Sequence, residues 1–381
     1  MMRPADSTDE LINAVDSKIT AVRTSNLDLS MNELADMYEA GELVIDPDFQ
    51  RMFRWTDGAQ SRFIESLILE LPVPPIFLIE REDRVYELID GLQRISSYLH
   101  FRGVLKIDGE LLDPLVLQDC DIVPELNGLI FRNLPRALDI KLKRSYIRAE
   151  ILRKESDPRL RYYMFKRLNT GGEILSEQEV RNATIRLLSS DFNNFVIELS
   201  GNSEFKHSIN IISDAQRKRK FDQELVLRFF SYKNNFENYS HDVSDFMTDY
   251  MESVSDPELG QRFDYQSERS VFEKTFSILR KIADELQIES KIFGTIGPSG
   301  EPRGQFSVYH YEGITLGLQP VLGLIDPDDD QQIQRLAKAV KSGKADPLFL
   351  DNTGAGKNYS APMRARVSYF EQKFRSAIEH A

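Results

Sequence analysis

The sequence predicts an α+β protein. A small mixed sheet with helices is expected in residues 1–190, and a mainly helical domain in residues 191–381. Three observations predict this division. Short apolar runs typical of strands occur mainly in the first half, helical patterns occur in both halves, and a length of 381 residues favours two domains.

Capping signals and apolar periodicity define the elements of the first domain. Residues 1–25 are polar and predict a loose arm or a first helix. Ser30 followed by Glu33 is a capping box, so a helix is expected to start there and to end near Gly41. The elements expected after it, in order, are a strand at 43–45, a helix at 58–69, a hairpin of strands at 76–79 and 85–89, a helix at 93–101, an irregular region with short strands at 104–142, a strand at 146–151, and helices at 157–168 and 176–188.

Beyond residue 190 the apolar spacing is helical and strand signals are few. Helices are expected at about 222–236, 243–254, 268–287, 328–341 and 360–379.

The composition narrows the classes of function. The net charge is −13, which argues against a protein that coats DNA without regard to sequence, although a local basic patch remains compatible with it. Cys120 is the single cysteine and the five histidines are scattered, so neither a zinc site nor a haem is expected. No apolar run approaches the length of a membrane span and no signal peptide is recognisable, so we expect a cytoplasmic protein that does not bind membranes.

Residues 90–94 could carry chemistry, because a buried strand ends there and a helix begins. Asp90 can hold Mg²⁺ or orient a water, and Gly91 lets a ligand approach the backbone. Gln93 can position a water, and Arg94 can neutralise phosphate charge. The structural alternative makes Asp90 a helix cap and Arg94 a surface residue. Spacing alone favours that alternative, since short turn motifs are weak signals.

Further motifs occur in a fixed order around this turn. They are Gln50-Arg51 with Trp55, Pro72-x-Pro74-Pro75-Ile76-Phe77-Leu78, Ile89-Asp90-Gly91-x-Gln93-Arg94, Phe165-x-Arg167-Leu168-Asn169-Thr170-Gly171-Gly172 and Leu175-Ser176-x-x-Glu179-x-Arg181-Asn182. From about Asp46 to Asn182 the chain resembles the N-terminal domain of GmrSD-type restriction endonucleases, within the ParB/sulfiredoxin-like superfamily. The family signature is Asp-Gly-Gln-Gln-Arg, and this chain has Leu92 at the third position.

The resemblance implies a component of a prokaryotic antiphage system that binds and hydrolyses a nucleoside triphosphate, with Mg²⁺, and regulates action on foreign DNA. Its partners would be DNA or a nuclease subunit, and a homo-oligomer is compatible with it. It implies catalytic roles for Asp90, Gln93 and Arg94. The residues implied to contact phosphate are Gln50, Arg51, Gly91, Arg167, Asn169, Thr170 and Gly171.

Two other functions remain open. The basic run Arg217, Lys218, Arg219 and Lys220 could contact DNA phosphates, which suits a ParB-like DNA-binding protein or nuclease without nucleotide hydrolysis. A solvated loop explains the same run as well. The third hypothesis is a non-enzymatic scaffold subunit. A His-x-x-x-Asn-His-like cluster would indicate an HNH-type nuclease domain, and none follows residue 190. We therefore expect the helical half to act in sensing, docking or DNA contact.

Overall fold

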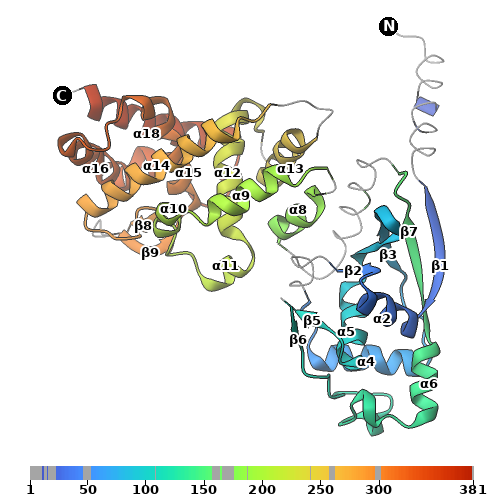
Figure 1. Ribbon diagram of the computed structural model, residues 1–381. Coiled ribbons are helices and arrows are strands. Elements are labelled where there is room, and N and C mark those ends of the chain that lie inside the picture. The colour runs from blue at the N-terminus through green and yellow to red at the C-terminus, as the bar shows by residue number, and fades with distance from the viewer. Residues whose placement is uncertain are drawn as a thin grey trace. The chain divides into compact units, whose positions relative to one another are not determined.

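The computed structural model describes residues 11–12, 15, 23–45, 53–107, 109–156, 164, 176–186, 188–240, 242–256, 262–296 and 302–379. The chain divides into two compact units, Met1–Leu175 and Ser176–Ala381 (Figure 1). The boundary expected at residue 190 lies inside the second of these units. An α+β organisation is confirmed, with a sheet and helices in the first unit and mainly helices in the second.

The first unit is built on a mixed sheet of five strands in the order β1-β7-β3-β4-β2. The strands are β1 (Thr24–Ser30), β2 (Leu43–Val44), β3 (Ile76–Glu80), β4 (Tyr86–Asp90) and β7 (Tyr146–Leu152). β1 pairs with β7, and β3 with β4, in antiparallel fashion, whereas β7 with β3 and β4 with β2 are parallel. The expected hairpin of the third and fourth strands is therefore confirmed.

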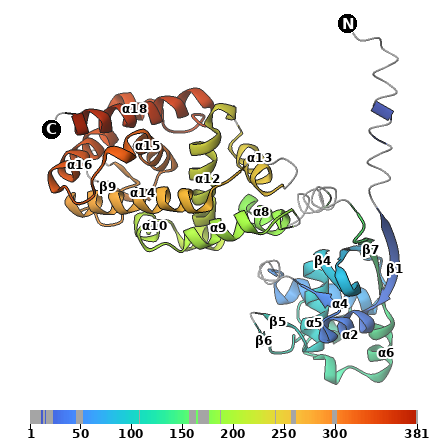
Figure 2. The ribbon, with the colours of Figure 1, turned by 45° about the horizontal axis from the view of Figure 1, so that its top comes forward.

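Side chains of β7 alternate between the two faces of the sheet. Ile147, Ala149 and Ile151 are buried on one face, whereas Tyr146 and Arg148, on the other face, are exposed. The helices of this unit are α2 (Met31–Ala40), α4 (Asp57–Ile68), α5 (Leu92–Arg102) and α6 (Arg136–Arg144), together with short 3-10 turns at Pro124–Leu126 and Phe131–Asn133. Figure 2 shows these helices grouped around the sheet.

The capping signals were read correctly. Ser30 accepts a hydrogen bond from the Glu33 N–H at the start of α2, and Gly41 ends that helix in the left-handed conformation. Ser176 and Glu179 form a capping box at the start of α8 (Glu177–Ile185), within the helix expected at 176–188.

Two elements of the first unit differ from the expectation. The polar N-terminal arm was predicted to extend to residue 25, but β1 already begins at Thr24. The region 104–142 was expected to be irregular with short strands. It does contain the short strands β5 (Lys106–Ile107) and β6 (Glu110–Leu111), but α6 begins within it. The helix expected at 157–168 lies outside the described residues, apart from Met164, which is helical.

The second unit is mainly helical, as predicted. Its further helices are α9 (Asp191–Ser200), α10 (Ser203–Ser208), α11 (Asp214–Lys218), α12 (Phe221–Asn235), α13 (Val243–Ser255), α14 (Tyr265–Glu285), α15 (Val308–Leu318), α16 (Asp330–Ala345), α17 (Pro347–Leu350) and α18 (Ser360–Glu379). The hairpin of β8 (Gly294–Ile296) and β9 (Pro302–Phe306), and the helices α9, α10, α11, α15 and α17, were not predicted.

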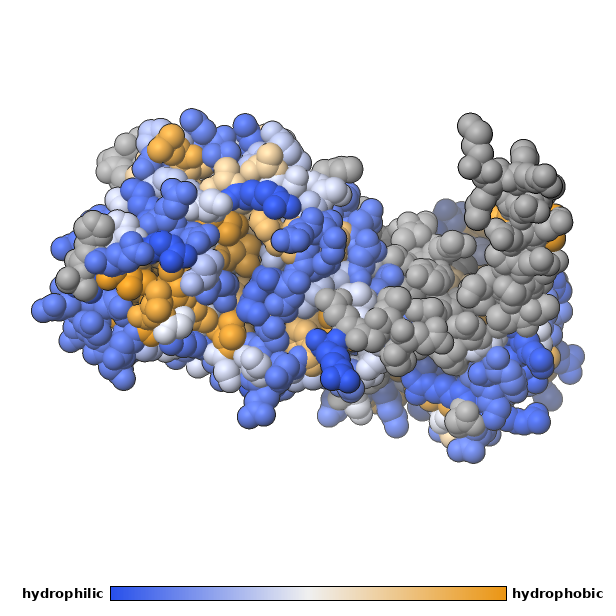
Figure 3. Space-filling model, turned by 90° about the horizontal axis from the view of Figure 1, so that it is seen from above, coloured by the Kyte–Doolittle hydropathy of each residue, from blue (hydrophilic) through white to orange (hydrophobic). Residues whose placement is uncertain are grey.

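An ion network is buried in the core of the second unit. The Glu312 carboxylate accepts hydrogen bonds from Arg228 and Arg366, each at 2.7 Å, and its side chain is 2% exposed. On the face shown in Figure 3, hydrophilic residues dominate the surface of this unit and apolar areas lie between them. Within the described ranges, no helix has the length and apolar character needed to cross a membrane.

Candidate functional site

Asp90 stands at the end of β4, and α5 begins two residues later. Gly91 between them is the N-cap residue, with a φ of 101°, and no side chain caps this helix. A Cβ added to Gly91 would lie 2.4 Å from Cγ2 of Ile76, so both conformation and space require glycine here. Asp90 is therefore not the helix cap that the structural alternative assumed, and its carboxylate bonds to Arg94 instead.

Arg94 holds that carboxylate. Its Nη2 donates to Oδ2 of Asp90 at 2.8 Å. Its Nη1 donates to the carbonyl oxygens of Pro74 and Pro75, the latter at 2.7 Å. The side chain of Arg94 is 14% exposed and that of Asp90 is 32% exposed. Since charge-assisted hydrogen bonds are strong, Arg94 fixes the orientation of Asp90 relative to the turn before β3.

Gln93 connects α5 to the chain that precedes α4. Its Oε1 accepts hydrogen bonds from the backbone N–H groups of Arg54 and Trp55, at 3.0 and 3.1 Å. The carbonyl of Trp55 accepts a hydrogen bond at 2.9 Å from Nε2 of Gln60, a buried residue of α4. Two glutamines on neighbouring helices therefore hold the backbone of Trp55 from both sides.

Comparison with known proteins shows which family the segment that carries this site resembles. Residues 31–186 match the family described as GmrSD restriction endonuclease, N-terminal domain. This part of the chain belongs to that family. Neither the curated proteins nor the solved structures contain a match. The chain thus carries a GmrSD-type N-terminal domain, which points to a component of a restriction or antiphage system.

Sequence reasoning missed Gln60 and His100 in the GmrSD-type domain. Nδ1 of His100 lies 2.8 Å from Oε1 of Gln60, and Nε2 lies 2.8 Å from the carbonyl oxygen of Asp113. The signal that could have found Gln60 is its position, because a polar residue on the buried face of an amphipathic helix needs a partner. These bonds extend the anchoring of Trp55 to the loop that follows α5.

Leu92, where the GmrSD-type signature has glutamine, is 5% exposed and belongs to the hydrophobic core. The change therefore alters packing beneath the helix start, while the polar groups of Asp90, Gln93 and Arg94 keep the contacts described above.

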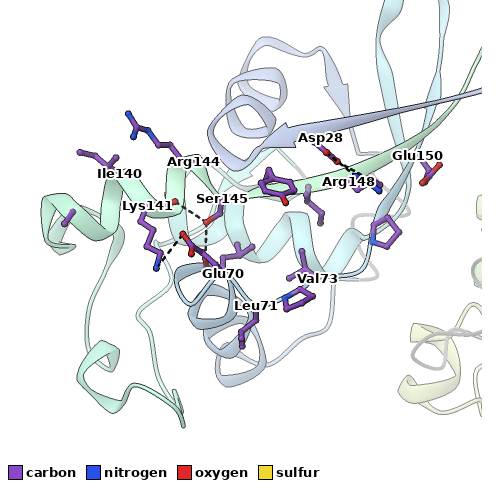
Figure 4. A pocket seen from close by; sticks show the side chains of 16 residues that line it. Asp28, Glu70, Leu71, Val73, Ile140, Lys141, Arg144, Ser145, Arg148 and Glu150 are labelled. Atoms are coloured by element: carbon purple, nitrogen blue, oxygen red, sulfur yellow. Dashed lines mark hydrogen bonds and ion pairs between the residues drawn. The ribbon is translucent and has the colours of Figure 1, made fainter.

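A cavity of about 1040 Å³ lies beside the Pro74–Pro75 turn. It is lined by Pro75, by Arg148 and Glu150 of β7, and by side chains of β1 and α6 (Figure 4). Phe77 of β3 pairs in register with Asp90 on one side and with Glu150 on the other. Glu150, which lines the cavity, and Asp90 thus lie on the two strands that flank Phe77 in the sheet.

Several predicted site residues lie outside the described residues, namely Gln50, Arg51, Arg167, Asn169, Thr170 and Gly171. The basic run is described: Arg217 and Lys218 end α11, Arg219 follows, and Lys220 precedes α12 with a φ of 59°. Among the described residues, no group of three or more His, Cys, Asp or Glu side chains could hold a metal ion.

Proposed function

We propose that the GmrSD-type domain binds and hydrolyses a nucleoside triphosphate and thereby regulates a restriction or antiphage system that acts on foreign DNA. The observation that carries the proposal is the Asp90 carboxylate, which Arg94 orients at the junction of β4 and α5. The first N–H groups of a helix have no partner within that helix, so this junction can receive phosphate oxygens.

Asp90 is the candidate for the chemical role. Its carboxylate can orient the attacking water or accept its proton. One carboxylate also fits Mg²⁺, which proteins commonly bind through one or two carboxylates together with substrate phosphates and water. Asp90 would hold the ion, and the charge of the ion would neutralise the phosphates. Gly91 would let a phosphate approach the backbone.

Gln93 and Arg94 act in this proposal as positioning residues. Gln93 fixes the backbone of Arg54 and Trp55, and Arg94 fixes Asp90. The contacts of Gln50, Arg51, Arg167, Asn169, Thr170 and Gly171 with phosphate stay a prediction. DNA or a nuclease subunit is the proposed partner that responds to the nucleotide.

Phosphate release from each of the common nucleoside triphosphates with Mg²⁺, with and without DNA, tests the proposal. Asp90→Asn should lower the rate about a hundredfold or more, as the loss of a general base does. Asp83→Asn is the matched control, because Asp83 is an exposed carboxylate in the turn between β3 and β4. Wild-type protein that neither hydrolyses a nucleotide nor gains thermal stability from one would refute the proposal.

A further inference from the structure

A second charged feature of the first unit lies outside the Asp90 junction. Residues 131–148 contain six basic residues and one acidic residue, which gives a net charge of +5 within a chain of −13. The basic residues are Arg132, Arg136, Lys141, Lys143, Arg144 and Arg148, and the acidic one is Asp139. Clustered positive charge on an acidic protein marks a surface for a polyanion.

All four arginines of this segment are exposed. Arg148 pairs with Asp28, Lys141 with Glu70 and Lys143 with Asp139. No described residue forms an ion pair or hydrogen bond with the guanidinium groups of Arg132, Arg136 and Arg144. The three arginines are left to interact with solvent or with a ligand.

The helix geometry brings these cations into one stripe. Arg136, Ile140 and Arg144 follow one another at intervals of four residues, which places them on one side of α6 over about 12 Å. In Figure 4, Ile140 and Arg144 point away from Glu70, toward which Lys141 turns, and all of these side chains line the cavity. Tyr146, 65% exposed, continues the surface just beyond the helix end.

We propose that this surface, formed by Arg132, Arg136, Ile140, Arg144 and Tyr146 and named the α6 face, binds the phosphate backbone of DNA. Along about 12 Å of its axis, a DNA strand presents three to four phosphates, so two arginines at that spacing can each meet one. Arginine also suits phosphate because its fork of N–H groups can bind two oxygens at once.

The segment that contains the α6 face has a larger net positive charge than the segment around the basic run that the sequence singled out, although the run itself has four cations and the α6 face has three. Residues 214–224 contain four basic and three acidic residues, a net charge of +1 against +5 for residues 131–148. Arg217 of that run also donates hydrogen bonds to the carbonyl and side-chain oxygens of Asn210. The cations of the basic run are therefore offset by neighbouring acids in the sequence, and one of them is already engaged, whereas the segment of the α6 face keeps a large net positive charge.

DNA fits this face better than an acidic peptide does. Ile140, Arg144 and Tyr146 also line the cavity described above, together with the carboxylates of Asp28, Glu70 and Glu150. A flexible acidic peptide could enter the cavity and would meet these carboxylates. A duplex is too wide to enter a cavity of about 1040 Å³, so its backbone would meet the arginines from outside. The proposal does not depend on nucleotide hydrolysis, so its outcome is separate from that of the proposed function.

Fluorescence anisotropy of the full chain with a short labelled DNA duplex, titrated at several salt concentrations, tests this inference. The variant Arg136→Gln/Arg144→Gln should bind about tenfold more weakly, and the dependence of log K on log salt should lose about two units of slope. The matched control is Lys338→Gln/Lys341→Gln, which removes two exposed lysines of α16 and should bind like wild type.

Three results would overturn the inference: wild type that does not bind the duplex, unchanged binding by the Arg136/Arg144 variant, or loss of binding only when Arg217 and Lys218 are replaced by Gln. Arginine-dependent capture of polyglutamate in place of DNA would also contradict it and would identify an acidic protein as the partner. Circular dichroism melting of each variant separates a binding defect from unfolding.

Discussion

Substitutions of Gln93 test whether this residue acts through its side-chain NH2 group or through its side-chain carbonyl oxygen. The two hydrogen bonds it accepts from Arg54 and Trp55 are neutral and partly exposed to solvent, so each contributes about 0.5–1 kcal/mol. Gln93→Ala should therefore lower the free energy of unfolding of the first unit by about 1–2 kcal/mol. For a unit of this size that change lowers Tm by a few degrees.

Gln93→Glu is the matched variant, because a carboxylate oxygen can accept both bonds. A negative charge in the first turn of a helix is also favourable, so this variant should retain most of the stability. Urea denaturation followed by circular dichroism measures both. Equal destabilisation by Ala and Glu would refute the role assigned to the carbonyl oxygen. If the variants retain nucleotide hydrolysis, the Glu variant should also be the more active of the two.

Three other substitutions test the fold around and beyond the site. Gly91→Ala should cost about 2–5 kcal/mol, because the left-handed conformation and the contact with Ile76 both oppose a Cβ; thermal melting near wild type would contradict this. Glu312→Gln should cost about 3–5 kcal/mol by removing the carboxylate that pairs with the buried Arg366, while Arg228 keeps Glu224; Glu371→Gln, at an exposed helix pair, should change stability by less than about 0.5 kcal/mol in the same urea titration. Burial lowers the pKa of Lys344 to about 7 from its usual 10.5, so between these values the unfolded chain binds a proton that the folded chain lacks. The free energy of unfolding of the second unit should rise with pH there by about 1 kcal/mol per unit, and Lys344→Met should abolish that rise.

The parts of the fold that the sequence predicts are those whose apolar pattern matches their burial. β3 is a continuous apolar run and is buried, so its strand and its hairpin partner were recognised. β1 was missed although Leu27 and Leu29 alternate with polar residues, because two apolar positions are a short signal; on this edge strand Leu29 is buried and Leu27 is 43% exposed. α6 was missed because it is short and rich in charged residues, and it buries a single described residue, Leu142, although Leu138 and Leu142 lie four residues apart on it.

The candidate site was located by its local pattern, a strand followed by a glycine turn and a helix. The hydrogen-bond partners of its polar side chains could not be predicted from that pattern. Gln93 contacts backbone groups 38 and 39 residues away, and Arg94 contacts carbonyl groups 19 and 20 residues away. Partners so distant along the chain depend on how the helices pack, which no short motif encodes.

The contacts divide the Asp-Gly-x-Gln-Arg motif into residues that shape the junction and one that remains for chemistry. Gly91 adopts the left-handed backbone conformation of the turn, and Leu92 packs in the core. The side chains of Gln93 and Arg94 bind backbone groups of other segments. Among the described residues, the Asp90 carboxylate is bonded to Arg94 alone and keeps a third of its surface exposed. A glutamine at position 92 would bury an amide that needs a partner, whereas leucine needs none. The departure from the family signature is thus compatible with an intact site, because it changes the core below Asp90 and leaves the carboxylate as it is.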